Sequence, residues 1–156
     1  GLVNPKYDFD QINTLSFKLV TTTMGAFALE SFGGLARTLS IATAPTNQVI
    51  STGKQINETP EFSILCGNNI DMWRMEAWYQ MVKTGMIGYK NAAVLQCYGD
   101  TLLDQDNMKV KLSVVIDEIF PIEFGTPAFS TDGDGEVGMA TGRFSVYGTS
   151  VFPIPD

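Results

Sequence analysis

The stretch that most constrains this chain is Asn68 to Gly85, NNIDMWRMEAWYQMVKTG. It predicts the only helix, with an Asn cap at its start and a glycine at its end. At 100° per residue its apolar side chains form two adjoining stripes. The first contains Ile70, Trp73, Ala77 and Met81, and the second contains Met75, Trp78 and Val82, continued by Met72 and Tyr79. Because a helix on the surface of a monomer normally has one apolar stripe, we expect one stripe to pack on the chain's own sheet and the other to contact a neighbouring subunit.

The two tryptophans give this expectation its energetic basis. Each Trp buries about 150–250 Å², which corresponds to roughly 4–6 kcal/mol of transfer free energy at ~25 cal/mol/Å². Leaving one in water would cost a sizeable part of a domain's net stability of ~5–15 kcal/mol. We therefore predict contacts with a neighbouring subunit through Trp73, Trp78, Met75 and Val82. The alternative is a helix buried under long loops of its own chain.

Around this helix, alternating hydrophobic patterns predict about seven strands. They cover residues 14–22, 26–32, 35–42, 60–66, 92–99, 108–119 and 137–151. Pro121 is expected to bend or end the strand before it. These elements predict an α+β, mainly β fold, a β-sandwich or small β-barrel flanked by one α-helix, in a single domain that covers residues 1–156.

Three segments fall outside this pattern. They are an N-terminal arm at about residues 1–13, a long loop at about 43–59 and a C-terminal tail at about 152–156. The loop has no sustained period, yet it contains Val49, Ile50 and Ile56, which is more apolar bulk than a solvated linker needs. We expect these residues to contact a surface outside the monomer. A flap folded over the chain's own sheet is the alternative.

Composition argues against catalysis and against cofactors. The chain has no histidine, which removes the commonest general base and the usual catalytic triads. Asp132, Asp134 and Glu136 resemble the start of a calcium loop, but Val137 and Arg143 occupy its sixth and twelfth positions. We predict no catalytic, cofactor-binding or metal-binding residues, and hence no enzyme.

The cysteines and the charge narrow the remaining possibilities. Cys66 and Cys97 lie in apolar, strand-like surroundings, where a reduced thiol is usual and a disulfide is the alternative. The formal charge is −7 without a basic run, which argues against gripping a phosphate backbone. No signal peptide and no membrane-length apolar run are visible, so we expect synthesis in a cytoplasm without membrane insertion.

The stretches FALESFGGL, DMWRMEAWYQMVKTG and KVKLSVVIDEIFPIEFG follow one another along the chain. Together they resemble the tail tube proteins of long-tailed bacteriophages, a superfamily that is similar to the tube protein of type VI secretion. FALESFGGL at 27–35 resembles an early strand and turn of that family. DMWRMEAWYQMVKTG at 71–85 resembles its helix, and KVKLSVVIDEIFPIEFG at 109–125 resembles a late strand that closes on a proline and a glycine. The resemblance covers most of the chain, although Cys66 and Cys97 are not part of the family pattern.

The resemblance implies a structural subunit of a phage tail tube. Such subunits form hexameric rings stacked into a helical tube that conducts genomic DNA and the tape measure protein. The resemblance therefore implies that the helix contacts lie within a ring and that Val49, Ile50 and Ile56 bridge successive rings. The acid excess suggests an acidic lumen. The implied partners are copies of the chain itself, a contractile sheath, the tape measure protein and the baseplate or terminator proteins. The implied place is the virion tail, assembled in the host cytoplasm. Alternatives are a type VI-like tube protein, a terminator or baseplate tube adaptor, and a β-barrel that binds a small apolar ligand.

Overall fold

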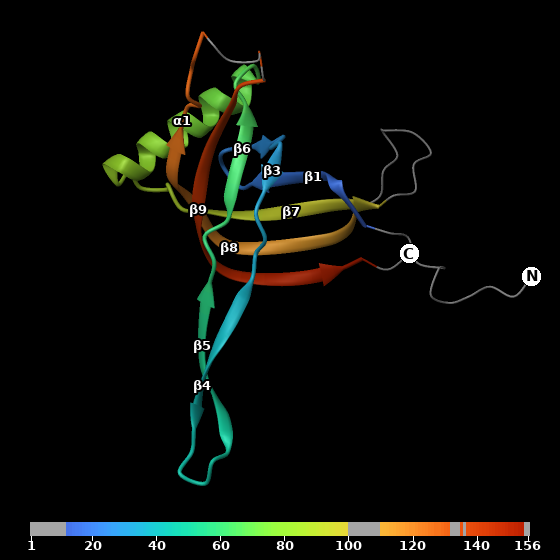
Figure 1. The fold of residues 1–156 in the computed structure, drawn as a ribbon, viewed down its shortest axis with the longest axis vertical. Coiled ribbons are helices and arrows are strands. Elements are labelled where there is room, and N and C mark those ends of the chain that lie inside the picture. The colour runs from blue at the N-terminus through green and yellow to red at the C-terminus, as the bar shows by residue number, and fades with distance from the viewer. Residues whose placement is uncertain (1–11, 100–109, 132–134, 136, 155–156) are drawn as a thin grey trace, which may run out of the picture.

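The computed structural model describes residues 12–99, 110–131, 135 and 137–154. Ten elements follow one another along the chain (Figure 1). They are β1 (Ile12–Thr21), β2 (Ala26–Phe27), β3 (Ser31–Phe32), β4 (Arg37–Thr43), β5 (Val49–Asn57), β6 (Glu61–Leu65), α1 (Asn69–Thr84), β7 (Asn91–Gly99), β8 (Val110–Gly125) and β9 (Met139–Pro153). The chain is mainly β with one helix in the described part, which confirms the predicted fold class.

The strands form one curled sheet and one separate hairpin. The sheet has seven strands in the order β2-β1-β7-β8-β9-β6-β3, and β4 and β5 pair only with each other. The long strands β8 and β9 bend through the sheet, so that it wraps like half a barrel, while the β4–β5 hairpin projects away from it (Figure 1). The part of the chain that the structure describes is therefore a half-barrel rather than a closed barrel.

The helix lies against the sheet and closes one end of the core. Trp78 is fully buried, with Phe27 at 6.0 Å and Phe144 at 5.8 Å between ring centroids. Its indole nitrogen donates to the backbone oxygen of Tyr89 at 2.6 Å, which satisfies the one polar group of the ring. Met75 is buried beside it, so the second of the two predicted stripes is the one that packs on the sheet.

Both predicted helix ends are confirmed. The Asn68 side chain accepts a hydrogen bond from the Asp71 amide at 3.3 Å. Gly85 has a left-handed φ of 68° and its amide donates to the carbonyls of Met81 and Val82. These contacts satisfy backbone groups that a helix terminus otherwise leaves free.

Two strand predictions are wrong in extent. The predicted strand 26–32 forms only the two-residue strands β2 and β3, which pair with different neighbours, β1 and β6. Pro121 does not end its strand, because β8 continues to Gly125, and the register shift after Pro121 fits the bend that was the other predicted outcome. The last pair between β7 and β8 is Asn91 with Ile119. Pro121 therefore lies where β8 has no β7 partner, and its missing amide hydrogen leaves no ladder bond unmade.

Candidate assembly surfaces

The prediction of a long loop at 43–59 is wrong, because the structure places β5 within this segment. Residues 49–57 pair with β4 in an antiparallel hairpin whose turn is closed by hydrogen bonds between Ala44 and Gln48 and between Asn47 and Ala44. The register shifts between the pairs Leu39–Gln55 and Ile41–Ser51. Gly53, which lies in β5 between these two pairs, has a φ of 76°. The shift disrupts the period of two, and every residue from Val49 to Ile56 is exposed. A strand with no buried face has no reason to alternate.

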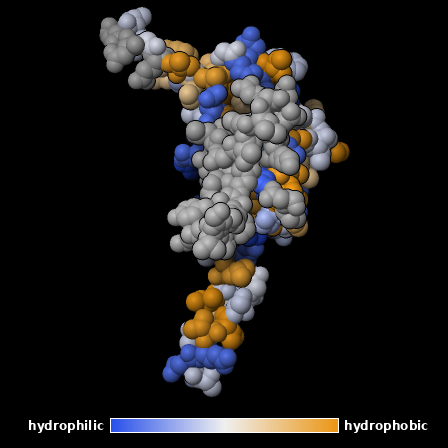
Figure 2. Space-filling model, turned by 90° about the vertical axis from the view of Figure 1, so that its right-hand side faces the viewer, coloured by the Kyte–Doolittle hydropathy of each residue, from blue (hydrophilic) through white to orange (hydrophobic). Residues whose placement is uncertain are grey.

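The hairpin exposes large apolar side chains along its length (Figure 2). They are Leu39, Ile41, Val49, Ile50 and Ile56, with exposed fractions between 48% and 67%. The register puts the first three on one face and the last two on the other. At its base, the Arg37 guanidinium donates to the Thr149 carbonyl at 2.8 Å. Because a two-stranded hairpin is at best marginally stable in water, this one is expected to be covered by another molecule.

The outer side of α1 is a second exposed apolar surface. Ile70 is 71% exposed and Trp73 is 76% exposed, and both line a shallow apolar hollow. This is the first of the two predicted stripes. Of the four predicted ring contacts, only Trp73 is fully available to a neighbouring chain.

The assignments of Met75 and Trp78 as ring contacts are wrong. Both side chains have no exposed surface in the monomer, because they fill the core between α1 and the sheet. Val82 is partly buried and packs against the same core. One apolar stripe of the helix therefore packs in the core of the chain, and the other lies on the outer surface. This agrees with the expectation that one stripe packs on the chain's own sheet.

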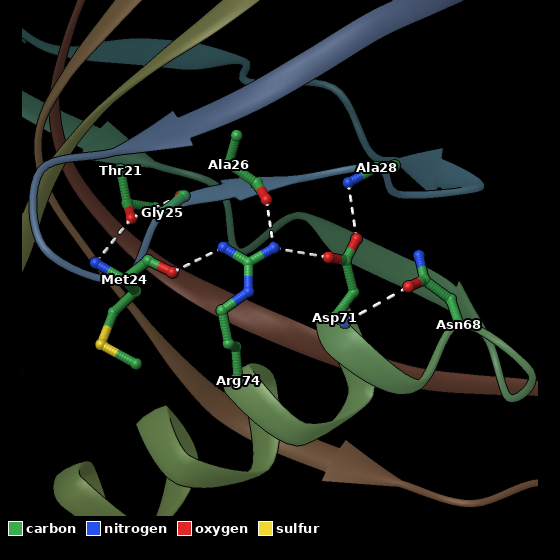
Figure 3. Close-up of polar contacts among 8 residues, drawn as sticks. All are labelled: Thr21, Met24, Gly25, Ala26, Ala28, Asn68, Asp71 and Arg74. Atoms are coloured by element: carbon green, nitrogen blue, oxygen red, sulfur yellow. Dashed lines mark hydrogen bonds and ion pairs between the residues drawn. The ribbon is translucent and has the colours of Figure 1, made fainter.

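An ion pair fixes the direction in which this outer face points (Figure 3). Asp71 is buried and its Oδ1 lies 2.5 Å from Nη2 of Arg74, while its Oδ2 accepts the Ala28 amide at 2.7 Å. Arg74 donates to the carbonyls of Met24, at 2.9 Å, and Ala26. The first turns of α1 are thus bound to residues 24–28, and Ile70 and Trp73 are left exposed beside Arg74.

Phe27 and Gly25 leave room for the Arg74 guanidinium. The guanidinium carbon lies 4.6 Å from the centre of the Phe27 ring. Gly25 has a φ of 87°, and a Cβ at this position would collide with Nη1 of Arg74. The sequence showed Asp71 and Arg74 as the only charges within the apolar arc of the helix. Since burying one charge alone is costly, that spacing was a signal that the two side chains pair.

Among the residues that the structure describes, the curled sheet has two long edges without a neighbouring strand. On the side away from β7, β1 pairs with β2 only at Leu19 and Val20. On the side away from β8, β9 pairs with β6 only as far as Arg143. The sequence analysis did not identify these edges, because strand order is set by tertiary contacts. In β9 the edge carries exposed apolar side chains, at Tyr147, Val151 and Phe152.

The described residues offer little for bound ions or redox chemistry. They contain no group of three or more His, Cys, Asp or Glu side chains placed to hold a metal. Both cysteines are free thiols, and burial raises the pKa of Cys97 above its usual value. The calcium-like Asp132, Asp134 and Glu136 lie outside the described residues. In the same part of the chain, no helix is long and apolar enough to cross a membrane.

Together, the curled open-edged sheet, the single packed helix and the projecting hairpin define the fold of tube proteins from contractile injection systems. A chain of the sheath–tube complex of an extracellular contractile injection system, in its extended state, superposes with a TM-score of 0.67 at 8% identity, over 98% of this chain and 100% of that one. A chain of the anti-feeding prophage baseplate gives 0.64 at 9% identity, over 97% and 98%.

The same fold occurs in a tube-terminating cap and in an Hcp protein. The cap of the anti-feeding prophage gives a TM-score of 0.62 at 14% identity, covering 99% of this chain and 95% of that one. An Hcp protein gives 0.53 at 6% identity, over 88% and 97%. No protein-family model matches the sequence, and a comparison with curated proteins finds no sequence match. The predicted tail-tube fold is confirmed at the level of structure.

Proposed function

We propose that this chain is the structural subunit of a phage tail tube built from stacked hexameric rings. Its partners would be copies of itself, a contractile sheath, the tape measure protein and the baseplate or terminator proteins. DNA and the tape measure protein would pass through the lumen, and the tube would be assembled in the host cytoplasm into the virion tail. The whole-length likeness to chains of tube-containing injection systems supports a structural role in a tube.

The observation that carries this proposal is the pair of open edges on β1 and β9. The strands β1, β7, β8 and β9 alternate in direction, since each neighbouring pair is antiparallel. With an even number of alternating strands, the β9 edge of one copy runs antiparallel to the β1 edge of the next. Six copies could therefore join into one closed sheet, which removes the open edges of β1 and β9 and so the hazard of uncontrolled pairing there.

An acidic lumen is a further part of the proposal. One face of the four strands carries the cross-strand rows Lys18–Gln96–Ser113–Phe152 and Val20–Val94–Val115–Ser150, in which Lys18 is the only charge. The described residues hold eight acidic and eight basic side chains out of 17 and 10, so the excess of −7 comes entirely from residues outside them. If those residues line the lumen, their charge would repel DNA and keep it from binding to the wall.

Two alternatives remain, and each has a specific observation. The match to the tube-terminating cap fits a terminator or adaptor that forms a single ring. An apolar hollow of about 260 Å³ between β1, β7, β8 and residues 32–35 would be the place for a small apolar ligand. The ligand-binding alternative requires a stable monomer, which the exposed hairpin argues against.

Electron microscopy and native mass spectrometry of the purified chain test the proposal. We expect rings of six copies with a central hole, and tubes in which these rings stack. Rings that never stack would favour the terminator or adaptor. A fully folded monomer at high protein concentration would contradict every tube-related function.

A further inference from the structure

The two exposed apolar surfaces lie towards opposite ends of the molecule. The β4–β5 hairpin forms one end of the long axis, and α1 lies towards the other (Figure 1). The hairpin of a chain therefore cannot cover its own helix face. A second copy placed head to tail brings the two surfaces together, and each supplies the apolar cover that the other lacks.

Charge distinguishes this pairing from a generic hydrophobic contact. Between Arg37 and Asn57 the hairpin contains no carboxylate. Arg37 is held at the base by the Thr149 carbonyl, so Lys54 is the cation that the hairpin presents to a neighbour. On α1, Glu76 is exposed one turn after Trp73, and its Oε1 accepts a hydrogen bond from the Gln80 amide at 2.9 Å. A negative charge thus borders the apolar helix face, and a positive charge lies within the apolar hairpin.

The hairpin and the helix are also similar in length. Nine residues of strand at ~3.3 Å each and two strands ~4.8 Å apart give each hairpin face an area of roughly 30 by 10 Å. A sixteen-residue helix is about 24 Å long at 1.5 Å per residue. Docking one hairpin face on the helix would bury roughly 300 Å² of the hairpin. This is a part of the ~800 Å² per partner that is typical of a stable interface, and it adds to the area buried where the β1 and β9 edges of neighbouring copies pair.

We propose that the β4–β5 hairpin of one copy docks across the outer face of α1 in the next copy, with Lys54 beside Glu76. This inference rests on the proposed tube function and names the contact that repeats along the tube. The contact is heterologous, because different surfaces meet, so it repeats from copy to copy without closing on a pair. The Val49, Ile50 and Ile56 surface and the Trp73 surface are then two sides of one interface rather than two separate interfaces.

A charge-swap experiment tests the docking. Lys54→Glu or Glu76→Lys alone places like charges together, which at an interface costs enough to raise the critical concentration for assembly about tenfold or more. The double variant restores the ion pair in reverse and should return the critical concentration to near that of the native chain. Sedimentation at several protein concentrations measures it. Single variants that assemble normally, or a double variant no better than the singles, would overturn the docking.

Disulfide trapping provides a second test that does not depend on charge. In a chain with Cys66→Ala and Cys97→Ala, one preparation carries Ile41→Cys and another carries Trp73→Cys. Mixed and oxidised, they should give a cross-linked dimer, whereas Ile41→Cys mixed with Ile87→Cys should not, because Ile87 lies beyond the helix end. Tubes without the Ile41–Trp73 cross-link would refute the docking but leave the tube function intact. A native chain that forms no assembly at all would instead refute the tube function.

Discussion

Trp73 and Trp78 lie on opposite sides of the same helix. Trp78 is fully buried and donates its indole hydrogen to the Tyr89 carbonyl, whereas Trp73 is 76% exposed and lines a hollow on the outer surface. One tryptophan therefore serves the fold of the single chain, and the other is available to a partner. This division gives a matched pair of substitutions that separates folding from assembly.

Trp78→Ala should lower the free energy of unfolding by about 3–5 kcal/mol, because it leaves a large cavity between Phe27 and Phe144. Trp73→Ala should change it by less than ~1 kcal/mol, since surface substitutions have small effects. Urea denaturation under conditions where the chain is unassembled measures both. Trp73→Ala should instead reduce assembly. Equal destabilisation by the two variants would contradict the assigned positions.

Arg74→Met tests the ion pair that binds α1 to residues 24–28. It would leave the buried Asp71 carboxylate with the Ala28 amide but without its cation. Removing one partner of a buried pair costs ~3–5 kcal/mol, and we expect the lower end because the Arg74 side chain is 25% exposed. The double variant Asp71→Asn with Arg74→Met should recover part of the loss in urea denaturation. A single variant as stable as the native chain would show that the pair does not fix the helix.

Gly142→Ala should prevent stable pairing of β6 with β9. A Cβ at this position would lie 2.6 Å from Cζ of Phe62 and would also collide with the Glu123 carbonyl, which is backbone and cannot move aside. We expect a loss of about 3 kcal/mol or more, as for other overpacked core sites. Gly67→Ala is the control, because nothing lies within 4 Å of its added methyl. Thermal unfolding of both variants decides the matter, and a stable Gly142→Ala chain would contradict the close approach.

The helix could be predicted from sequence because its signals are local. Its caps at Asn68 and Gly85 and its two stripes are set by neighbouring residues. The choice between the stripes was not local, since both are apolar and periodicity does not say which one meets the sheet. Asp71 and Arg74 held that information, because a pair of charges within an apolar arc is expected where another segment of the chain supplies polar partners.

The hairpin and the sheet edges could not be predicted in the same way. Strand β5 is exposed on both faces, so the burial that normally produces alternation is missing. At Pro121 the sequence did not decide between a bend and an end of the strand, because whether a proline ends a strand depends on whether a neighbouring strand needs its amide. The open edges of β1 and β9 follow from strand order, which is decided by contacts between residues far apart in the chain.

Excision of residues 37–57 should separate assembly from folding. The Glu58 amide donates to the Ala36 carbonyl at 3.3 Å, so a short Gly-Gly link can join the two ends at the base of the hairpin. The core contains no residue of β4 or β5, and we expect the thermal midpoint to change little. Rings should form without stacking into tubes, as seen by electron microscopy. Tubes of normal length would contradict a bridging role for the hairpin.

Val151→Pro tests ring closure through the β9 edge. The Thr149 carbonyl accepts Arg37 on the side away from β8, and the Ile154 amide donates towards β8 at Lys111, so alternation directs the Val151 amide outwards. Proline at this position removes an outward donor and leaves the ladder to β8 intact. We expect a folded chain that stays monomeric, whereas Val151→Thr should still form rings. Native mass spectrometry with circular dichroism distinguishes these results. Six-copy rings from the proline variant would show that the subunits join through some other surface.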